Sequence, residues 1–170
     1  RQRGLDVEEC PVERSALEPG SIDFALCIQT IEHVGDPVAI LRAIGKLLKP
    51  GGRLYLITDN TGSPDFKITK GRHWGGYHFP RHWNLFNKPS MRKLAAAAGL
   101  EVAKLSTTTS PVNWTYSIRN TLVDWNSPKW MVNRFSLKAA PALAVFTALD
   151  TGFTIIGRGA LLRVILKRPK

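Results

Sequence analysis

At 170 residues, with 44% apolar and 22% charged side chains, the chain has the size and composition of one globular domain, which excludes a wholly disordered or fibrous protein. The net charge of +11 is uneven, because residues 1–36 hold three basic and eight acidic side chains and the remainder is strongly basic. A basic surface either attracts anionic partners such as lipid headgroups or is simply solvated. Aromatic residues are not interleaved with the bases, which argues against nucleic acid as a partner.

Two stretches near the beginning of the chain predict strands. Residues 5–13 are short, partly alternating and contain β-branched side chains, so we expect a strand that leads into a loop. Residues 22–29 form a nearly continuous apolar run, which is typical of a strand covered on both faces in a parallel sheet. Cys27 lies in that run and, because its spacing from Cys10 fits no metal or redox motif, is expected to be a small buried side chain. A reducing, cytoplasmic compartment is therefore expected.

The clearest helix begins at Asp36-Pro37. Asp36 can cap it, and Pro37 suits the first helical position, where the missing N–H costs nothing. Apolar side chains recur with helical spacing up to Leu48, and Lys-Pro-Gly-Gly at residues 49–52 ends the pattern. A second buried-type strand follows at residues 53–60. This strand–helix–strand order predicts parallel strands and therefore an α/β fold.

Residues 59–87 form a long segment rich in Gly, His, Trp and Asn with no sustained period, and such loops are often functional. A second helix–strand unit follows, with Asn87 as the cap, Gly99 as the stop and a strand at residues 100–105. The side chains of this helix that are expected to face the core are Met91, Leu94, Ala95 and Ala98.

The last third of the chain predicts helices before a final strand. Residues 111–138 predict a helical insertion that is broken at Ser127-Pro128. Residues 139–157 are very apolar, but Asp150 within them argues against a membrane span. We expect a helix buried against the sheet, with a helix lying in a membrane interface as the alternative. Residues 161–168 predict the closing strand.

Several of these motifs, taken in order, resemble the central signature of the class I S-adenosylmethionine-dependent methyltransferases. In that family a strand ends in a polar turn, and Glu-His (here Glu32-His33), an Asp-Pro helix start (Asp36-Pro37) and Lys-Pro-Gly-Gly follow. Residues 78–102 resemble the family's histidine-containing loop and the helix after it. The similarity covers residues 4–106 and is greatest to the small-molecule enzymes of the ubiquinone-biosynthesis type.

The resemblance implies a Rossmann-like α/β sheet, mostly parallel with an antiparallel last strand, that lacks the family's first βαβ portion. Residues 1–170 then form one partial methyltransferase domain, in which residues 107–157 are the helical insertion and the apolar helix before the last strand. The family's glycine-rich turn and ribose-binding carboxylate are expected to precede Arg1. The implied function is methyl transfer from S-adenosylmethionine to a small-molecule acceptor, as part of a longer chain.

The resemblance also implies where S-adenosylmethionine binds. Ligands of open α/β sheets bind beyond the carboxyl ends of the strands, so the segment after the strand at residues 22–28 is expected to lie beside the methionine part of the cofactor. The turn at Pro11 corresponds to the family's adenine contact. Because Pro11 offers neither a carboxylate nor an N–H, its neighbours are expected to replace it. The expected cofactor-binding residues are Val12, Glu13, Ile28, Gln29, Thr30 and Glu32.

Methyl transfer needs a general base only when the acceptor must lose a proton. Histidine titrates near neutrality and suits this role. His82 is the first choice because it corresponds to the family's loop histidine, followed by His78 and His33. The alternative is that the polar and aromatic side chains here only hold the loop in place. No metal is expected. The expected walls of an apolar acceptor pocket are Trp74, Tyr77 and Trp83.

A second functional hypothesis is a non-catalytic methyltransferase-like domain that binds an anionic surface or partner through its basic half. A glycine-rich motif upstream of Arg1 would favour the enzyme over this alternative. The sequence favours a cytoplasmic location and leaves peripheral contact with a membrane open. It does not define the acceptor, the atom that is methylated or the oligomeric state.

Overall fold

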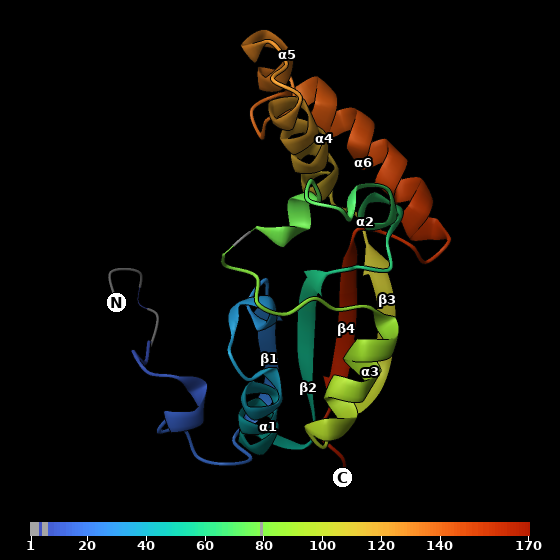
Figure 1. Cartoon of the computed structure of the whole chain (residues 1–170). Coiled ribbons are helices and arrows are strands. Elements are labelled where there is room, and N and C mark those ends of the chain that lie inside the picture. The colour runs from blue at the N-terminus through green and yellow to red at the C-terminus, as the bar shows by residue number, and fades with distance from the viewer. Residues whose placement is uncertain (1–3, 5–6, 79) are drawn as a thin grey trace.

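The computed structural model describes residues 4, 7–78 and 80–170. Within them one sheet has the strand order β1-β2-β4-β3 (Figure 1). Strand β1 pairs with β2 in parallel, and β4 is antiparallel to both β2 and β3. Three strands therefore point the same way and the last is antiparallel, which confirms the predicted α/β sheet. The strands are β1 (Ile22–Ile28), β2 (Leu48–Asp59), β3 (Glu101–Thr108) and β4 (Leu161–Lys167).

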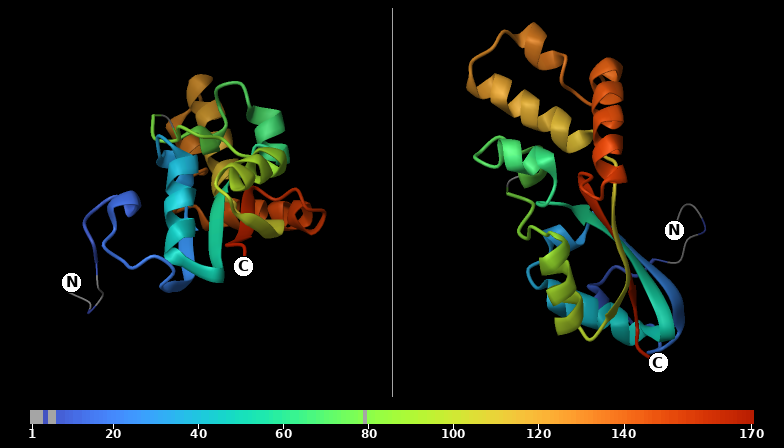
Figure 2. Two further views of the ribbon diagram at one scale, coloured as in Figure 1. Left: turned by 90° about the horizontal axis from the view of Figure 1, so that it is seen from below. Right: turned by 90° about the vertical axis from the view of Figure 1, so that its right-hand side faces the viewer.

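Two helices, α1 (Pro37–Leu47) and α3 (Lys88–Ala97), cover the same face of the sheet (Figure 2). Both predicted caps are confirmed. The Asp36 carboxylate accepts a hydrogen bond from the Ala39 N–H at 2.9 Å, and Asn87 forms a reciprocal capping box with Ser90. The predicted core side chains of α3 are all buried. Lys-Pro-Gly-Gly does more than end α1, because these four residues already belong to β2.

The opposite face of the sheet is open on β1. Phe24, Leu26 and Ile28 are 54%, 63% and 48% exposed, whereas Cys27 on the helix-covered face is buried, as predicted. The prediction that this strand is covered on both faces is therefore wrong. An apolar run shows that both faces of a strand could be buried, but it does not show that both are. Here α1 and α3 lie on one side of the sheet, and no described helix packs on the other.

The strand predicted at residues 5–13 is also wrong for the residues that the structure describes; Leu5 and Asp6 lie outside them. The exposed segment from Val7 turns back on itself, because the Glu8 carboxylate accepts hydrogen bonds from the Ser15 hydroxyl and the Ala16 N–H. It ends in a single 3₁₀ turn, η1 (Val12–Arg14). Local side-chain hydrogen bonds of this kind compete with strand pairing.

Three further helices stand beyond the ends of the strands: α4 (Val112–Asp124), α5 (Lys129–Asn133) and α6 (Ala140–Ile155) (Figure 1). The predicted break at Ser127-Pro128 is confirmed. The prediction that α6 is buried against the sheet is wrong, because Asp150 is its only buried residue. The helix instead packs on α4, where Phe146 and Phe153 stack on the indole of Trp114. None of the described helices is long and apolar enough to cross a membrane.

Candidate functional site

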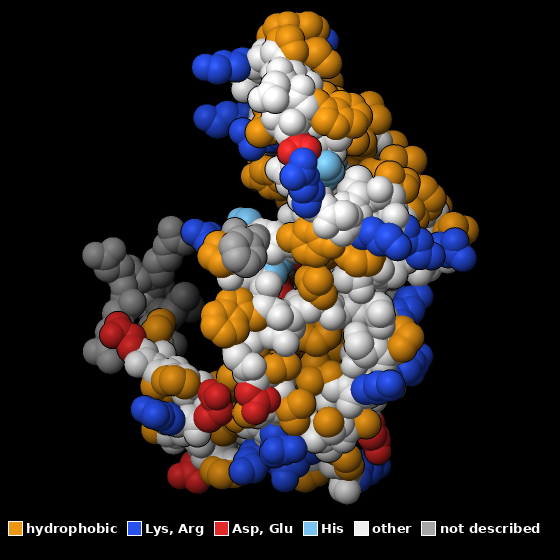
Figure 3. Space-filling model, viewed as in Figure 1, with side chains coloured by type: hydrophobic (Ala, Val, Ile, Leu, Met, Phe, Trp, Pro, Cys, Tyr) orange, Lys and Arg blue, Asp and Glu red, His pale blue; other side chains and the backbone are white. Residues whose placement is uncertain are grey.

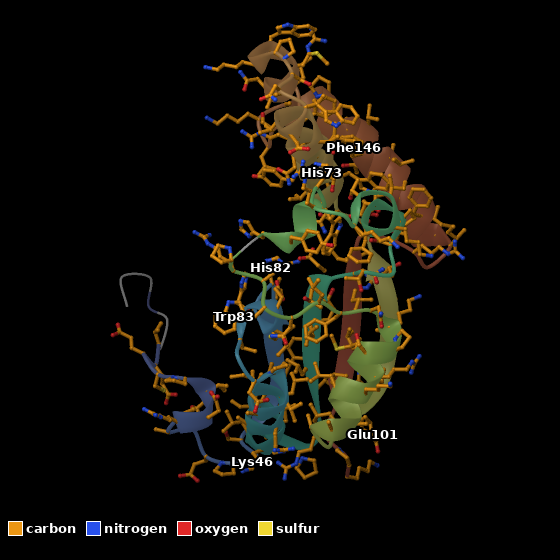
Figure 4. All side chains as sticks on the ribbon, viewed as in Figure 1. Lys46, His73, His82, Trp83, Glu101 and Phe146 are labelled. Atoms are coloured by element: carbon orange, nitrogen blue, oxygen red, sulfur yellow. The ribbon has the colours of Figure 1, made fainter. Side chains whose placement is uncertain are left out.

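A pocket of about 430 Å³, lined by several residues with polar side chains, lies where β1 and β2 end, between the sheet and the start of α4. His82 projects into this region from the loop that precedes α3 (Figure 4). Two short turns contribute to its lining, namely η2 (Ile31–His33) and η3 (Gly75–Tyr77). Helix α2 (Pro64–Thr69) packs on α4. The lining residues are Gln29, His33, Asp59, Gly75, His78, His82, Ser110, Val112, Asn113, Tyr116 and Leu161.

Glu32 fastens the loop to the sheet. Its side chain is 1% exposed and accepts a hydrogen bond from the Thr58 hydroxyl at 2.7 Å. Its backbone carbonyl accepts hydrogen bonds from the N–H groups of Trp83 and Asn84 at 2.8 and 3.1 Å. Burial raises the pKa of the Glu32 carboxyl, and the Thr58 hydrogen bond only partly opposes it. These contacts match the interpretation in which Glu32 holds the loop in place.

His82 is the best-positioned base in the pocket. The Nδ1 atom of this buried imidazole lies 2.7 Å from the Gly76 carbonyl oxygen and 3.3 Å from a carboxylate oxygen of Asp59. Burial lowers the pKa of His82, but the hydrogen bonds and the negative charge of Asp59 outweigh it, so the pKa lies above its ordinary value. With Nδ1–H directed at these two oxygens, Nε2 is the nitrogen that remains for proton transfer.

The other two histidines gather around His82. Its ring centroid lies 4.6 Å from that of His33 and 5.3 Å from that of His78, in edge-to-face arrangements. The Nδ1 atom of His33 lies 3.0 Å from the Arg81 carbonyl oxygen. Burial and the nearby charges of His82 and Arg81 lower the pKa of His78. The three predicted catalytic candidates therefore converge on one place.

A carboxylate completes a set of three ligand-type side chains within this cluster. Ligand atoms of Glu32, His33 and His82 all lie within 4.8 Å of one another. Two imidazoles and a carboxylate suit a transition-metal ion, although hydrogen bonds already engage part of this set. The expectation of a metal-free site stays a prediction.

Of the predicted cofactor-binding residues, Gln29 lines the histidine pocket, whereas Val12, Glu13, Ile28 and Thr30 lie outside its described lining. Gln29 adopts a left-handed backbone conformation (φ 48°), its N–H donates to the Ile57 carbonyl at 2.9 Å, and it lines the pocket with the histidines. Non-glycine residues in this conformation are uncommon and cluster at functional sites. The Thr30 hydroxyl donates to the carbonyl of Ile28, whose side chain points to the open face. Val12 shares a groove along β1 with Thr30, whereas Glu13 lies beside α1; neither lines the histidine pocket.

The three predicted aromatic walls lie around the pocket and not among its described lining residues. Trp74 is 1% exposed, and its indole N–H donates to the Asp65 carboxylate at 2.8 Å. The Tyr77 hydroxyl donates to the Lys70 carbonyl. Trp83 is 73% exposed and donates to the carbonyl of Pro80. Their contact with an acceptor stays a prediction.

Sequence reasoning missed the other lining residues, among them Asp59, Asn113 and Tyr116. The amide of Asn113 donates to the Asp59 carboxylate at 2.7 Å and so links α4 to the end of β2. Asp59 carries a usable signal, because it is the polar residue that ends a buried strand. Asn113 and Tyr116 carry none, because their helix reads as an insertion unrelated to the site.

The family profile described as a methyltransferase domain matches residues 2–105, more than half of the chain. The chain belongs to this family. Ubiquinone biosynthesis O-methyltransferases are among its relatives: that of Xanthomonas euvesicatoria pv. vesicatoria is 39% identical over 54% of this chain, and that of Marinobacter nauticus 30% identical over 67%. The sequence resemblance to class I methyltransferases of this type is thereby confirmed.

The matched parts of this methyltransferase domain span 41% and 52% of those two relatives, so the chain covers only about half of their length. Solved structures share the fold over nearly the whole chain. A SAM-dependent methyltransferase from Thermotoga maritima, 19% identical, gives a TM-score of 0.62 over 98% of this chain and 66% of its own. The cyclase SpnF, 18% identical, gives 0.55 over 99% and 58%. The predicted Rossmann-like methyltransferase fold is confirmed, whereas the reaction must be argued from the site.

Proposed function

We propose that this domain belongs to an enzyme that transfers a methyl group from S-adenosylmethionine to a small-molecule acceptor, at an oxygen atom. The observation that supports the proposal best is the buried pair of His82 and Asp59 in a pocket at the carboxyl ends of two parallel strands. The relatives named O-methyltransferases support oxygen as the acceptor atom.

The pocket fits part of the proposed cofactor. Its volume of about 430 Å³ lies in the usual range for small-molecule sites. Gln29 offers an amide that can pair with both charged groups of an amino acid, so Gln29, and Thr30 next to it in the groove along β1, are the proposed partners of the methionine end. Val12 and Glu13 remain the proposed adenine contacts. When bound, S-adenosylmethionine supplies a methyl group activated by its sulfonium.

His82 then acts as the general base. An acceptor hydroxyl that hydrogen-bonds to Nε2 of His82 would give up its proton to this nitrogen as the oxygen–methyl bond forms and the sulfur–methyl bond breaks, with S-adenosylhomocysteine as the leaving group. The Asp59 carboxylate and the Gly76 carbonyl hold the ring through Nδ1–H and stabilise the imidazolium that results. Transfer is an in-line displacement, so the remaining task of the pocket is to align the acceptor and exclude water. His33 and His78 pack against His82 as supports.

Calorimetric titration of S-adenosylhomocysteine into the full-length protein tests the proposal. We expect saturable one-to-one binding, weakened by Gln29→Ala and unaffected by Lys93→Ala on the outer side of α3. No heat of binding at millimolar ligand would exclude an S-adenosylmethionine-dependent enzyme. Cytoplasmic location with peripheral membrane contact is part of the same proposal and rests on a different surface.

Removing the charge of Asp59 is expected to move the titration of His82. Because Asp59 holds the pKa of His82 above its ordinary value, Asp59→Asn lowers that pKa. The acidic limb of the pH–rate profile then moves to lower pH, because His82 stays deprotonated, and able to act as a base, down to a lower pH. NMR titration of the His82 ring protons measures the shift directly. Asp124→Asn, whose carboxylate contacts His73 on another face, is the matched control and leaves the His82 titration unchanged.

A further inference from the structure

The outer face of α6 is apolar along its whole length. Val145, Leu149 and Ile156 recur at the spacing of one helical face and are 64%, 42% and 63% exposed, and Ile155 beside them is 80% exposed. The only charged residue of α6, Asp150, is buried on the opposite side. Apolar side chains gather over this part of the molecule in Figure 3. Contiguous exposed apolar surface of this kind marks a binding face.

The apolar surface continues from α6 onto the end of α4 and onto α5. Trp125, which ends α4, is 70% exposed, and Trp130 of α5 is 61% exposed. We call the exposed side chains of residues 123–156 the apolar tip. Indole rings are amphipathic and favour the boundary between hydrocarbon and water. Tryptophan at two exposed positions of one surface therefore suits a membrane interface better than bulk water.

The charges around the apolar tip are positive. Lys129, Arg134 and Lys138 are exposed within it, and the guanidinium of Arg134 lies over the Trp130 ring at 5.3 Å. Of the two acidic residues of this stretch, Asp150 is buried, and the charge of the exposed Asp124 is paired with Arg72 at 2.6 Å. Basic residues among apolar ones are typical of helices that bind anionic lipid.

An apolar hollow of about 390 Å³ opens beneath this surface. Phe135, Pro141, Val145 and Phe146 contribute to its wall, and Arg134 is the only charged residue among its described lining residues. A guanidinium beside an apolar hollow matches the two parts of a phospholipid, since the phosphate pairs with Arg and a chain segment enters the hollow.

We propose that the apolar tip docks on the surface of a bilayer that contains anionic phospholipid, with α6 lying in the interface. Charge favours this occupant over a second copy of the chain, because two copies that each carry a net charge of +11 repel one another when their basic tips meet. Helix α4 connects the tip to the catalytic pocket, which Asn113 and Tyr116 of its first turns line. Its 13 residues span about 20 Å, so docking holds the pocket near the bilayer.

Vesicle sedimentation with the full-length protein tests the docking independently of methyl transfer. The probe is a set of vesicles of phosphatidylcholine alone or with one third phosphatidylglycerol, at low and high salt. We expect binding to the anionic vesicles that falls steeply with salt. Leu149→Asp is expected to weaken the partition coefficient at least about tenfold, because it places a charge in the apolar contact. Lys129→Ala is expected to weaken it about fivefold, the effect of one base near an anionic surface.

Matched controls separate the tip from the rest of the chain. Ile68→Asp replaces an exposed apolar residue of α2, and Lys93→Ala removes an exposed base from α3. Both are expected to bind as the wild type does, and circular dichroism checks that each variant is folded. The proposal fails if the wild type stays in the supernatant with anionic vesicles, or if the controls lose binding as much as the tip variants. Self-association in ultracentrifugation that Leu149→Asp abolishes would instead assign the tip to a second copy.

Discussion

His82→Ala is expected to lower kcat for a phenolic acceptor by about 10²- to 10⁴-fold, the usual contribution of a positioned general base. The reason is geometric: Nδ1 of His82 is held by Asp59 and Gly76, which directs the free nitrogen into the pocket. Transfer of a radiolabelled methyl group to a panel of phenols, with the full-length protein, measures the rate. Binding of S-adenosylhomocysteine should be unchanged, because His82 acts on the acceptor.

The neighbouring histidines provide the controls. His78→Ala and His33→Ala remove supports of the ring and are expected to cost less than His82→Ala, with the pH profile displaced rather than abolished. A kcat within about threefold of the wild type for His82→Ala would contradict the assignment of the base. Loss of S-adenosylhomocysteine binding in the same variant would place His82 in the cofactor site instead.

His82 also makes stability depend on pH. Its pKa in the folded state is raised above the reference value of 6.5, so the protonated form stabilises the fold. This contribution is fully present below about pH 6.5 and is lost as the pH rises through the higher pKa of the folded state. The difference in unfolding free energy between wild type and His82→Ala should therefore shrink as the pH is raised across this window, as urea titrations can show.

Local signals in the sequence predict the covered half of the fold well. The caps at Asp36 and Asn87, the apolar spacing of α1 and α3 and the order of the strands follow from interactions within a few residues, so each was readable. The exposed face of β1 was not, because the same residues suit a strand covered on one side or both. What covers a strand depends on helices elsewhere in the chain.

In the site, too, local signals could be read from the sequence, whereas contacts between distant segments could not. The three candidate histidines, His33, His78 and His82, come together because strand ends in an α/β sheet meet at one edge and the loop must cross it. Asp59 and Asn113 lie 54 positions apart and meet only through the docking of α4. A contact set by tertiary packing leaves no trace in spacing, so the link between Asp59 and α4 could not be predicted, whereas the position of Asp59 at the end of its strand could have been.

Asp150→Ala is expected to destabilise the fold by about 3 kcal/mol, because it leaves several buried donors without an acceptor. The fully buried Asp150 carboxylate accepts hydrogen bonds from the N–H groups of Ser110 and Ala160 and from the indole N–H of Trp114. It thereby joins α6 to the starts of α4 and β4. Urea unfolding followed by tryptophan fluorescence measures the loss.

Two further variants decide whether these hydrogen bonds are the cause. Asp150→Asn keeps one acceptor oxygen and should lie between the wild type and Asp150→Ala, whereas Thr147→Ala on the exposed side of α6 should change stability by less than about 0.5 kcal/mol. If the wild type, Asp150→Asn and Asp150→Ala were equally stable, the stacking on Trp114 alone would hold α6 in place. In the sequence Asp150 argued against a membrane span. In the structure the same carboxylate fixes which side of α6 faces the protein, and therefore which side is left for a lipid surface.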